Sequence, residues 1–296
     1  MAAVAPSHLS SWVLAGRPRT LPIAVAPVLV GSALAAADGR FAPLPAAAAL
    51  VGALLLQVGA NLANDVFDFE KGADTEKRLG PPRAAQLGLL TPGALRSGTA
   101  LAFAAAACVG VYLVSAGGWP IAVLGAAAIA TGLAYTGGPW PLGYHGLGDA
   151  AVFLFFGLAA SCGTYWVQAL ELPARVAFAG VALGALATSI LAVNNLRDAA
   201  TDASAGKHTL AVRFGESFAR RQYTGLLALA YLVPAGLWAT GAATAGVWLA
   251  WLTLPWALKL AGRVRRESGA PLNEVLAATA RLELAFSALF ALGILC

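Results

Sequence analysis

Residues 43–68 read PLPAAAALVGALLLQVGANLANDVFD, an apolar run that ends in amides and carboxylates. A second run ends similarly, in Asn194-Asn195-Leu196-Arg197-Asp198, and both motifs place an Asp four residues after an Asn. Further acids follow, Asp74 after the first motif and Asp202 after the second. Ionisable side chains cost about 2.5 to 3.5 kcal/mol each at the bilayer centre, so they usually mark a functional site. The two matching clusters predict a binuclear cation site.

The composition indicates an integral membrane protein. Hydrophobic residues make up 59% of the 296 residues and charged residues only 11%, with a mean hydropathy of +0.74. Soluble domains carry roughly 25% charged residues. The first apolar run begins only after Arg17 and Arg19, and no short apolar segment with a small-residue cleavage site precedes it. We therefore predict no removable signal peptide.

Runs of about 17 to 25 apolar residues, the length that crosses a bilayer, divide the chain into candidate helices. We predict nine, near residues 21–38, 43–63, 97–115, 119–136, 149–169, 174–194, 223–240, 244–260 and 276–295. Nearly all Lys and Arg between them fall on one side, whereas the opposite loops hold only Arg40 and Arg175. The positive-inside rule places the richer side, with both Asp motifs, in the cytoplasm. The sequence thus predicts an all-α, polytopic protein of the cell membrane, with one transmembrane domain over residues 1–296.

The two motifs end the second and the sixth predicted helix. Because these helices are an even number of crossings apart, both cross the membrane in the same direction, as parallel repeats do. The motifs can then face each other across a central cavity. The formal net charge is +5, but the basic residues lie in loops beside membrane segments rather than on a soluble face. Membrane lipid headgroups and phosphorylated ligands are the predicted partners, and nucleic acid is not.

The side chains of the motifs suit a hard cation and a diphosphate. Mg²⁺ is commonly held by one or two carboxylates together with substrate phosphates. The candidate metal ligands are Asn61, Asn64, Asp65, Asp68, Asp74, Asn194, Asp198 and Asp202. Basic side chains nearby can neutralise the phosphate oxygens that the metals leave exposed. The candidate diphosphate-binding residues are Lys71, Lys77, Arg78, Arg83, Arg197, Lys207 and Arg213.

Several blocks in order resemble the UbiA superfamily of intramembrane prenyltransferases. The blocks are Arg17 to Pro22, Asn61 to Asp65, Gly80 to Arg83, Gly137 to Asp149 and Asn194 to Arg213. Within the superfamily they are similar to the 1,4-dihydroxy-2-naphthoate polyprenyltransferases of menaquinone synthesis. The resemblance implies a Mg²⁺-dependent enzyme that moves a polyprenyl chain from its diphosphate to this naphthoate, with loss of CO₂, giving demethylmenaquinol. Many members space the acids of the first motif more closely; here Asp74 follows Asp68 by six positions, and Glu70 competes for its role.

The prenyl-transfer reaction that the resemblance implies requires further residues near the diphosphate. The prenyl carbocation forms beside the leaving diphosphate, and a tyrosine face can stabilise a cation, which suits Tyr135. A base that takes the ring proton is expected at Asp198 or Asp202. An arginine can orient the carboxylate of the acceptor through a charge-assisted hydrogen bond. The candidate acceptor-binding residues are Arg17, Arg19, Asn195, Tyr144 and Asp149.

Other functions fit parts of this pattern. With an acceptor such as 4-hydroxybenzoate or homogentisate, the protein would still belong to the superfamily but not to its naphthoate branch. A secondary transporter also has parallel repeats and intramembrane carboxylates, but its site usually lies near the midplane, whereas these acids lie at helix ends beside basic loops. A CDP-alcohol phosphotransferase is another two-metal membrane enzyme, and its family motif is absent. Phe153, Phe155 and Phe156 either line a prenyl tunnel or pack against lipid.

Overall fold

A computed structural model describes residues 7–74 and 78–296, and its described part is helical without strands. The elements before the loop at residue 138 are α1 (His8–Gly16), η1 (Pro18–Thr20), α2 (Pro22–Ala37), α3 (Pro43–Glu70), α4 (Pro92–Gly117) and α5 (Trp119–Ala134). The later elements are η2 (Leu142–His145), α6 (Gly148–Val152), η3 (Phe153–Ala159), α7 (Ala160–Ala169), α8 (Ala174–Ser204), α9 (Leu210–Phe214), α10 (Glu216–Ala239), η4 (Ala245–Thr253), α11 (Leu254–Arg266) and α12 (Leu272–Leu295). The all-α prediction is confirmed.

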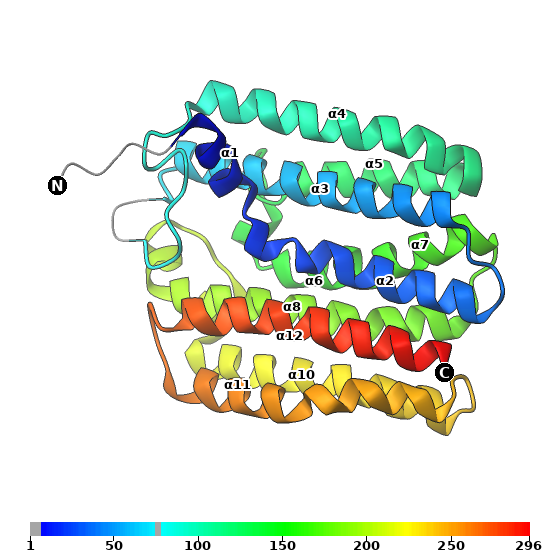
Figure 1. The fold of residues 1–296 in the computed structure, drawn as a ribbon. Helices are drawn as coiled ribbons and strands as arrows, with labels where there is room; N and C mark the ends of the chain where they lie inside the picture. Colours follow the sequence, from blue (N-terminus) through cyan, green and yellow to red (C-terminus); the bar gives the residue numbers. More distant parts are fainter. Residues whose placement is uncertain (1–6, 75–77) are drawn as a thin grey trace.

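The long helices lie side by side along one direction, with their connections gathered at two ends (Figure 1). At one end, on the left of Figure 1, lie the α3–α4 connection and the ends of both Asp motifs. The opposite end holds the short links between α2 and α3, between α4 and α5, and between α7 and α8. The two motifs therefore share one end of the bundle.

Five helical segments are long and apolar enough to cross a membrane by themselves, within the described ranges. They are α3, α4, the continuous stretch Gly148–Ala169, α8 and α12. A sixth is obtained if the pair His8–Thr20 and Pro22–Ala37, which bends by 51°, counts as one span. Every predicted apolar run overlaps a helix, but the number of nine crossings stays a prediction.

The two motif helices extend further than the sequence predicts. The helix predicted to end at residue 63 continues to Glu70, and the one predicted to end at residue 194 continues to Ser204. The polar motif residues stay helical because Asp65, Asp68 and Asp198 are buried and have partners inside the bundle. Each motif thus presents its acids from one rigid helix rather than from a loop.

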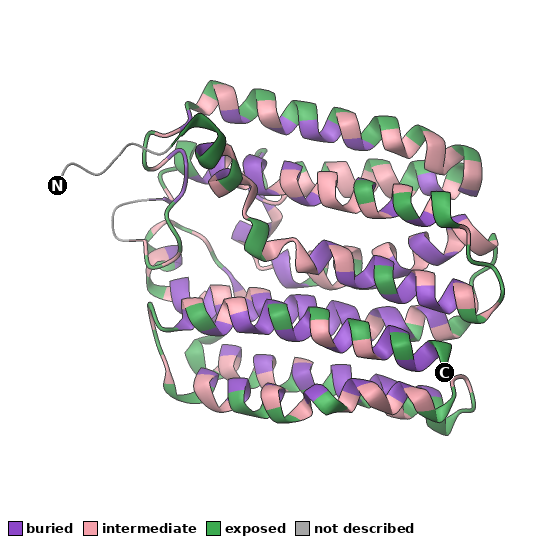
Figure 2. Cartoon of the chain, in the orientation of Figure 1, coloured by how far each residue is buried: buried purple, intermediate pink, exposed green. Residues whose placement is uncertain are grey.

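Burial is highest in α8, where purple residues are densest, whereas few residues of α4 are buried (Figure 2). Gly157, in the π-helical segment η3, faces Gly184 of α8 so closely that a Cβ atom on Gly157 would lie 2.4 Å from the Gly184 Cα. Leu186 of α8 and Phe286 of α12 belong to the main apolar cluster. Glu283 lies at the middle of α12, wholly buried, and neither carboxylate oxygen has a hydrogen-bond partner among the described residues.

Candidate active site

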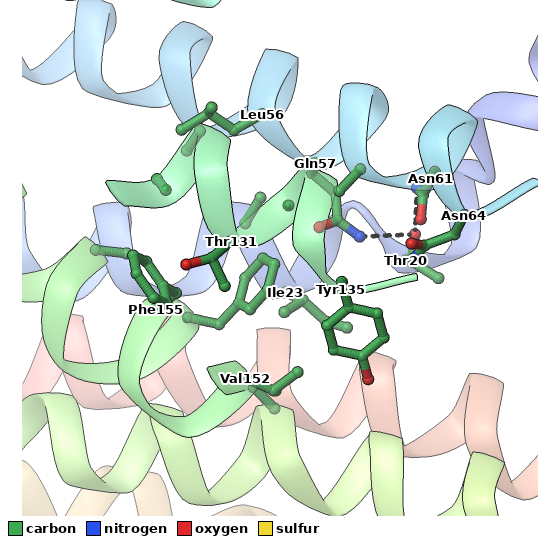
Figure 3. Close-up of a pocket in the computed structure, with 18 of the residues that line it drawn as sticks. Thr20, Ile23, Leu56, Gln57, Asn61, Asn64, Thr131, Tyr135, Val152 and Phe155 are labelled. Atoms are coloured by element: carbon green, nitrogen blue, oxygen red, sulfur yellow. Dashed lines mark hydrogen bonds between the residues drawn. The ribbon is translucent and has the colours of Figure 1, made fainter. Parts of the chain in front are cut away.

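A cavity of about 1140 Å³ extends between α2, α3, α4, α5, α7, α8 and α12. At the motif end it is lined by polar and charged side chains, which we call the polar end. Further from the motifs it is lined by aliphatic side chains, alanine and glycine, which we call the apolar arm. Figure 3 shows the junction of the two, where Tyr135, Ile23 and Phe155 lie below Gln57 of α3. Phe155 and Phe156 line the cavity, and Phe153 does not.

The polar end brings together residues that are far apart in the sequence. The predicted residues that line it are Arg17, Arg19, Asn61, Asn64, Asp68, Arg78, Arg83, Tyr135, Asn194, Asn195, Arg197 and Lys207. Another group of predicted residues does not line the cavity directly: Asp65, Lys71, Asp74, Tyr144, Asp149, Asp198, Asp202 and Arg213. Lys77 lies outside the described residues.

Asn61 is oriented by the N-terminal segment. Its amide nitrogen donates to the carbonyl oxygen of Gly16 at 2.9 Å and to Thr20 Oγ1 at 3.0 Å. Since an amide has two N–H groups, both are used, and the amide oxygen of Asn61 is left for a ligand. Asn64, one turn along α3, accepts a hydrogen bond from Thr136 Oγ1 at 2.8 Å.

Asp65 anchors the segment that follows Pro82. Its two carboxylate oxygens accept hydrogen bonds from the backbone N–H groups of Ala84 and Ala85, at 3.1 and 3.3 Å. Asp65 is fully buried, so these bonds satisfy a carboxylate that water cannot reach. The result is to place Arg83 at the polar end.

Asp68 and Asp74 share Arg83. Arg83 Nη2 donates to Asp68 Oδ2 at 3.3 Å, and its Nε lies 3.4 Å from Asp74 Oδ2. Arg78 donates to the other oxygen of Asp74. Burial raises the pKa of Asp74 to about 6, although Arg78 opposes this shift. The first motif and the segment after it therefore form one ion-pair network.

The second motif is held by Arg197. Its Nε and Nη2 donate to the two oxygens of Asp198 at 2.8 and 2.5 Å, while Nη1 donates to Asn273 of α12 at 2.7 Å. Asp202, one turn further along α8, lies 3.9 Å from the Lys207 ammonium. Arg197 thus joins α8 to α12 at the polar end.

Tyr144 lies between the two motifs. Its hydroxyl donates to Asp68 Oδ1 at 3.0 Å, and the ammonium groups of Lys71 and Lys207 lie 4.9 and 5.5 Å from its ring centroid. Burial and the charge of Asp68 raise the pKa of Tyr144, so it stays a neutral donor. For Lys207, burial lowers the pKa, but Asp68 and Asp202 outweigh it and the net shift is upward. Lys207 is therefore a stable cation here.

The oxygen atoms at the polar end fit a divalent cation that substrate oxygens would complete. Among the described residues, no three His, Cys, Asp or Glu side chains form a metal cluster of their own. Within the described part of the chain, Asp202 Oδ2 is buried without a hydrogen-bond partner, Asp74 Oδ2 has only the ion pair with Arg83 Nε, and the amide oxygen of Asn61 accepts no hydrogen bond. Hard oxygen ligands of this kind suit Mg²⁺, which usually keeps substrate oxygens or water in its shell.

Two predicted residues make other contacts. Arg213 donates to the backbone carbonyl of His208 at 3.1 Å, and Asp149 accepts from Gln222 at 2.8 Å. Sequence reasoning missed four polar residues with roles in this network: Thr20, Gln57, Thr136 and Asn273. Gln57 could have been found, since it is the single polar side chain inside the apolar run from residue 43 to residue 60.

Residues 24–282 match the UbiA prenyltransferase family. A relative from Mycobacterium tuberculosis named 1,4-dihydroxy-2-naphthoate octaprenyltransferase is 42% identical over 89% of both chains. One of the same name from Haemophilus influenzae is 37% identical over 97% of this chain and 96% of its own.

Solved structures share the fold at low sequence identity. The apo structure of a UbiA homolog from Aeropyrum pernix has a TM-score of 0.72 at 13% identity, over 91% of this chain and 96% of that one. A UbiA homolog from Archaeoglobus fulgidus, bound to DMAPP and Mg²⁺, has a TM-score of 0.68 at 14% identity, over 95% and 99%. On the match over most of its length and on these relatives, the chain belongs to the UbiA prenyltransferase family of membrane proteins.

Proposed function

We propose that this protein transfers a polyprenyl chain from polyprenyl diphosphate to 1,4-dihydroxy-2-naphthoate, with loss of CO₂, giving demethylmenaquinol. The observation that carries the proposal is a single cavity with two unlike parts. Its polar end has the cations and oxygen ligands for a diphosphate, and its apolar arm has room for a prenyl tail. The names of relatives at 37 to 42% identity support the naphthoate as acceptor.

The reaction exchanges one carbon–carbon bond for another. The C1–O bond of the prenyl diphosphate breaks, and diphosphate leaves with the electron pair. The ring carbon that carries the carboxylate bonds to C1, and CO₂ then departs while its bonding electrons restore the aromatic ring. Because CO₂ leaves in place of a ring proton, this reaction needs no base at that carbon. Asp198 and Asp202 therefore help to hold the divalent cation and balance the charges of Arg197 and Lys207, rather than acting as bases.

The residues of the polar end stabilise the leaving group. Arg78, Arg83, Arg197 and Lys207 all line the cavity and supply positive charge where diphosphate gains negative charge. Asn61, Asp68, Asp74 and Asp202 would hold Mg²⁺, which as a Lewis acid supplies further charge stabilisation. Burial of these groups excludes water, which would otherwise capture the prenyl carbocation.

Tyr135 and Arg17 are placed to contact the prenyl chain and the acceptor. Both line the cavity, Tyr135 at the junction with the apolar arm, where an aromatic face can stabilise the allylic cation (Figure 3). Arg17 Nη2 lies 3.5 Å from the backbone oxygen of Asn61, so its guanidinium is at the level of the first motif. There it can pair with the carboxylate of the acceptor before CO₂ is lost.

The test uses purified protein with a polyprenyl diphosphate, Mg²⁺ and carboxyl-labelled dihydroxynaphthoate. We expect label to be released as CO₂ in step with prenyl transfer. Preferential prenylation of 4-hydroxybenzoate, which keeps its carboxyl group, or of homogentisate would assign a different acceptor. Uptake of an ion or solute into vesicles without prenyl transfer would instead favour a transporter.

We also propose that residues 1–296 form one domain that crosses the membrane nine times, with the polar end facing the cytoplasm. The excess of basic residues on that side supports this orientation. Cys296, which is exposed, then lies at the outer face. In a variant that retains only this cysteine, an impermeant thiol reagent should label intact cells, and labelling only after lysis would contradict the orientation.

A further inference from the structure

Gln57 is a polar side chain in an otherwise apolar part of α3. It lies one helical turn before Asn61, lines the cavity and is only 7% exposed. Its Nε2 donates to Thr20 Oγ1 at 3.1 Å, and among the described residues its Oε1 has no hydrogen-bond partner. Because Gln57 lines the cavity, a ligand that covers this oxygen without offering a donor loses roughly 5- to 150-fold in its binding equilibrium.

The direction in which Gln57 presents its oxygen follows from the hydrogen bonds of Thr20. The Thr20 hydroxyl donates its one proton to the backbone oxygen of Arg17 at 2.9 Å. Thr20 Oγ1 therefore accepts from both amide neighbours, Asn61 and Gln57. Gln57 must turn its N–H group toward Thr20, so its carbonyl oxygen points into the cavity, as Figure 3 shows.

Thr20 thus orients two amide oxygens that differ in depth. The Asn61 oxygen lies at the level of the motif, and that of Gln57 lies one turn, about 6 Å, deeper along α3. Around Gln57 the walls include Ile23, Tyr135 and Phe155, which are large and apolar or aromatic, and the smaller Thr131 (Figure 3). A flat aromatic ring with one hydrogen-bond donor matches this surrounding better than a prenyl tail, which has no donor.

We infer that Gln57 Oε1 accepts a hydrogen bond from the 4-hydroxyl of the naphthoate and so selects acceptors that carry it. The inference rests on the proposed function and extends it. With the acceptor carboxylate at Arg17, which contacts the backbone of Asn61, the 4-hydroxyl is two ring positions away from the carbon that bears the carboxylate and is directed to the side of Gln57. Gln57 is a binding residue in this arrangement and takes no part in breaking bonds.

The test compares two acceptors that differ only in this hydroxyl, 1,4-dihydroxy-2-naphthoate and 1-hydroxy-2-naphthoate. The unmodified protein should prefer the dihydroxy compound by about 10-fold or more in kcat/KM, because without it the Gln57 oxygen stays unpaired. In Gln57→Leu the preference should fall to about 2-fold or less, through loss of the dihydroxy reaction alone. The KM for prenyl diphosphate should not change.

A merely structural role would give a different pattern. If Gln57 served only to hold Thr20 and Asn61, the variant would lose both acceptors equally and would bind prenyl diphosphate more weakly. Either result, or a preserved preference in Gln57→Leu, would overturn the inference. Gln57→Met provides the same test with an unbranched side chain if the leucine variant cannot be purified.

A matched control and a second readout complete the experiment. Gln168→Leu removes a glutamine of α7 that lies outside the cavity and bonds to Ser32 and Ala42, and it should leave the preference unchanged. Equilibrium binding of the two naphthoates without prenyl diphosphate should give the same ratio without any chemical step. If the unmodified protein prenylates no naphthoate, the proposed function fails with the inference; if it prenylates them without this preference, only the inference fails.

Discussion

The two parts of the cavity are built on opposite principles. At the polar end most acidic groups are paired with a basic group, as when Arg83 joins Asp68 and Asp74. In the apolar arm the space is created by what is missing: Gly110 and Gly125 line the cavity, and a Cβ on either would meet nothing within 4 Å. We infer that substitutions at the polar end change whether the reaction occurs, whereas those in the arm change which substrate fits.

The largest effect should come from removing the metal. Treatment with EDTA should reduce prenyl transfer to background, because the cations of the polar end alone do not replace a Lewis acid at the diphosphate. Added Mg²⁺ should restore the rate, measured as labelled prenyl product. EDTA saturated with Mg²⁺ beforehand is the control, and a chelated protein that kept its activity would break the assignment of the polar end.

A change in one carboxylate of the polar end should have the next largest effect. Asp68→Asn removes a charge that faces the cavity and that orients Arg83 and Tyr144, so turnover should fall by about 100-fold or more. Glu171→Gln, an exposed acid at the opposite end of the bundle, serves as the control. Turnover of Asp68→Asn within a few-fold of normal would remove Asp68 from the site.

In the apolar arm we expect selectivity rather than inactivation. Gly125 is ten residues before Tyr135, about 15 Å along α5, and an isoprenoid unit spans roughly 4 to 5 Å. Chains longer than about three units must therefore pass Gly125. In Gly125→Leu the added side chain should lower turnover of long prenyl diphosphates by about 10-fold or more and leave the two-unit substrate nearly unchanged.

The control for this selectivity is Gly225→Leu, at an exposed glycine of α10 where a Cβ also meets nothing within 4 Å. Product analysis with substrates of two to eight units measures the profile. A uniform fall across all chain lengths would show that the arm does not hold the tail.

The smallest effect should follow from Arg213→Ala. Arg213 lies outside the cavity and donates to the backbone of its own segment, so diphosphate should lose little stabilisation. We expect turnover to fall by less than about 3-fold, which corresponds to the modest value of a surface charge. Lys207→Ala is the comparison, because its ammonium lines the cavity, and an equal loss in both variants would contradict the boundary drawn around the polar end.

The sequence predicts which charged and amide residues belong to the polar end, but not which of them make contacts elsewhere. Asn61, Asp68 and Arg197 could be found because charged and amide groups after an apolar run are expensive and stand out. Asp149 and Arg213 are also charged residues of the matching polar blocks, yet they bond to Gln222 and to the backbone of His208. Composition cannot separate the two cases, because it does not show which charged side chains face the cavity.

Of the fold, too, the sequence predicts one part and not another. Apolar runs gave the position of the helices, but the motif helices continue to Glu70 and Ser204, since packing partners make buried acids compatible with a helix. The apolar arm could not be predicted at all. A glycine that opens a cavity and a glycine on the outer surface, such as Gly125 and Gly225, look alike until the helices are placed.

Glu283 has a consequence for the biogenesis of the protein. A charged side chain at the centre of a span costs about 2.5 to 3.5 kcal/mol when the helix enters the bilayer alone. In the finished fold Glu283 is wholly buried, and α12 packs against α2 and α8, which are synthesised earlier. Shielding from lipid is thus available only after those helices are in place. The insertion of α12 is thereby coupled to its assembly with helices made before it.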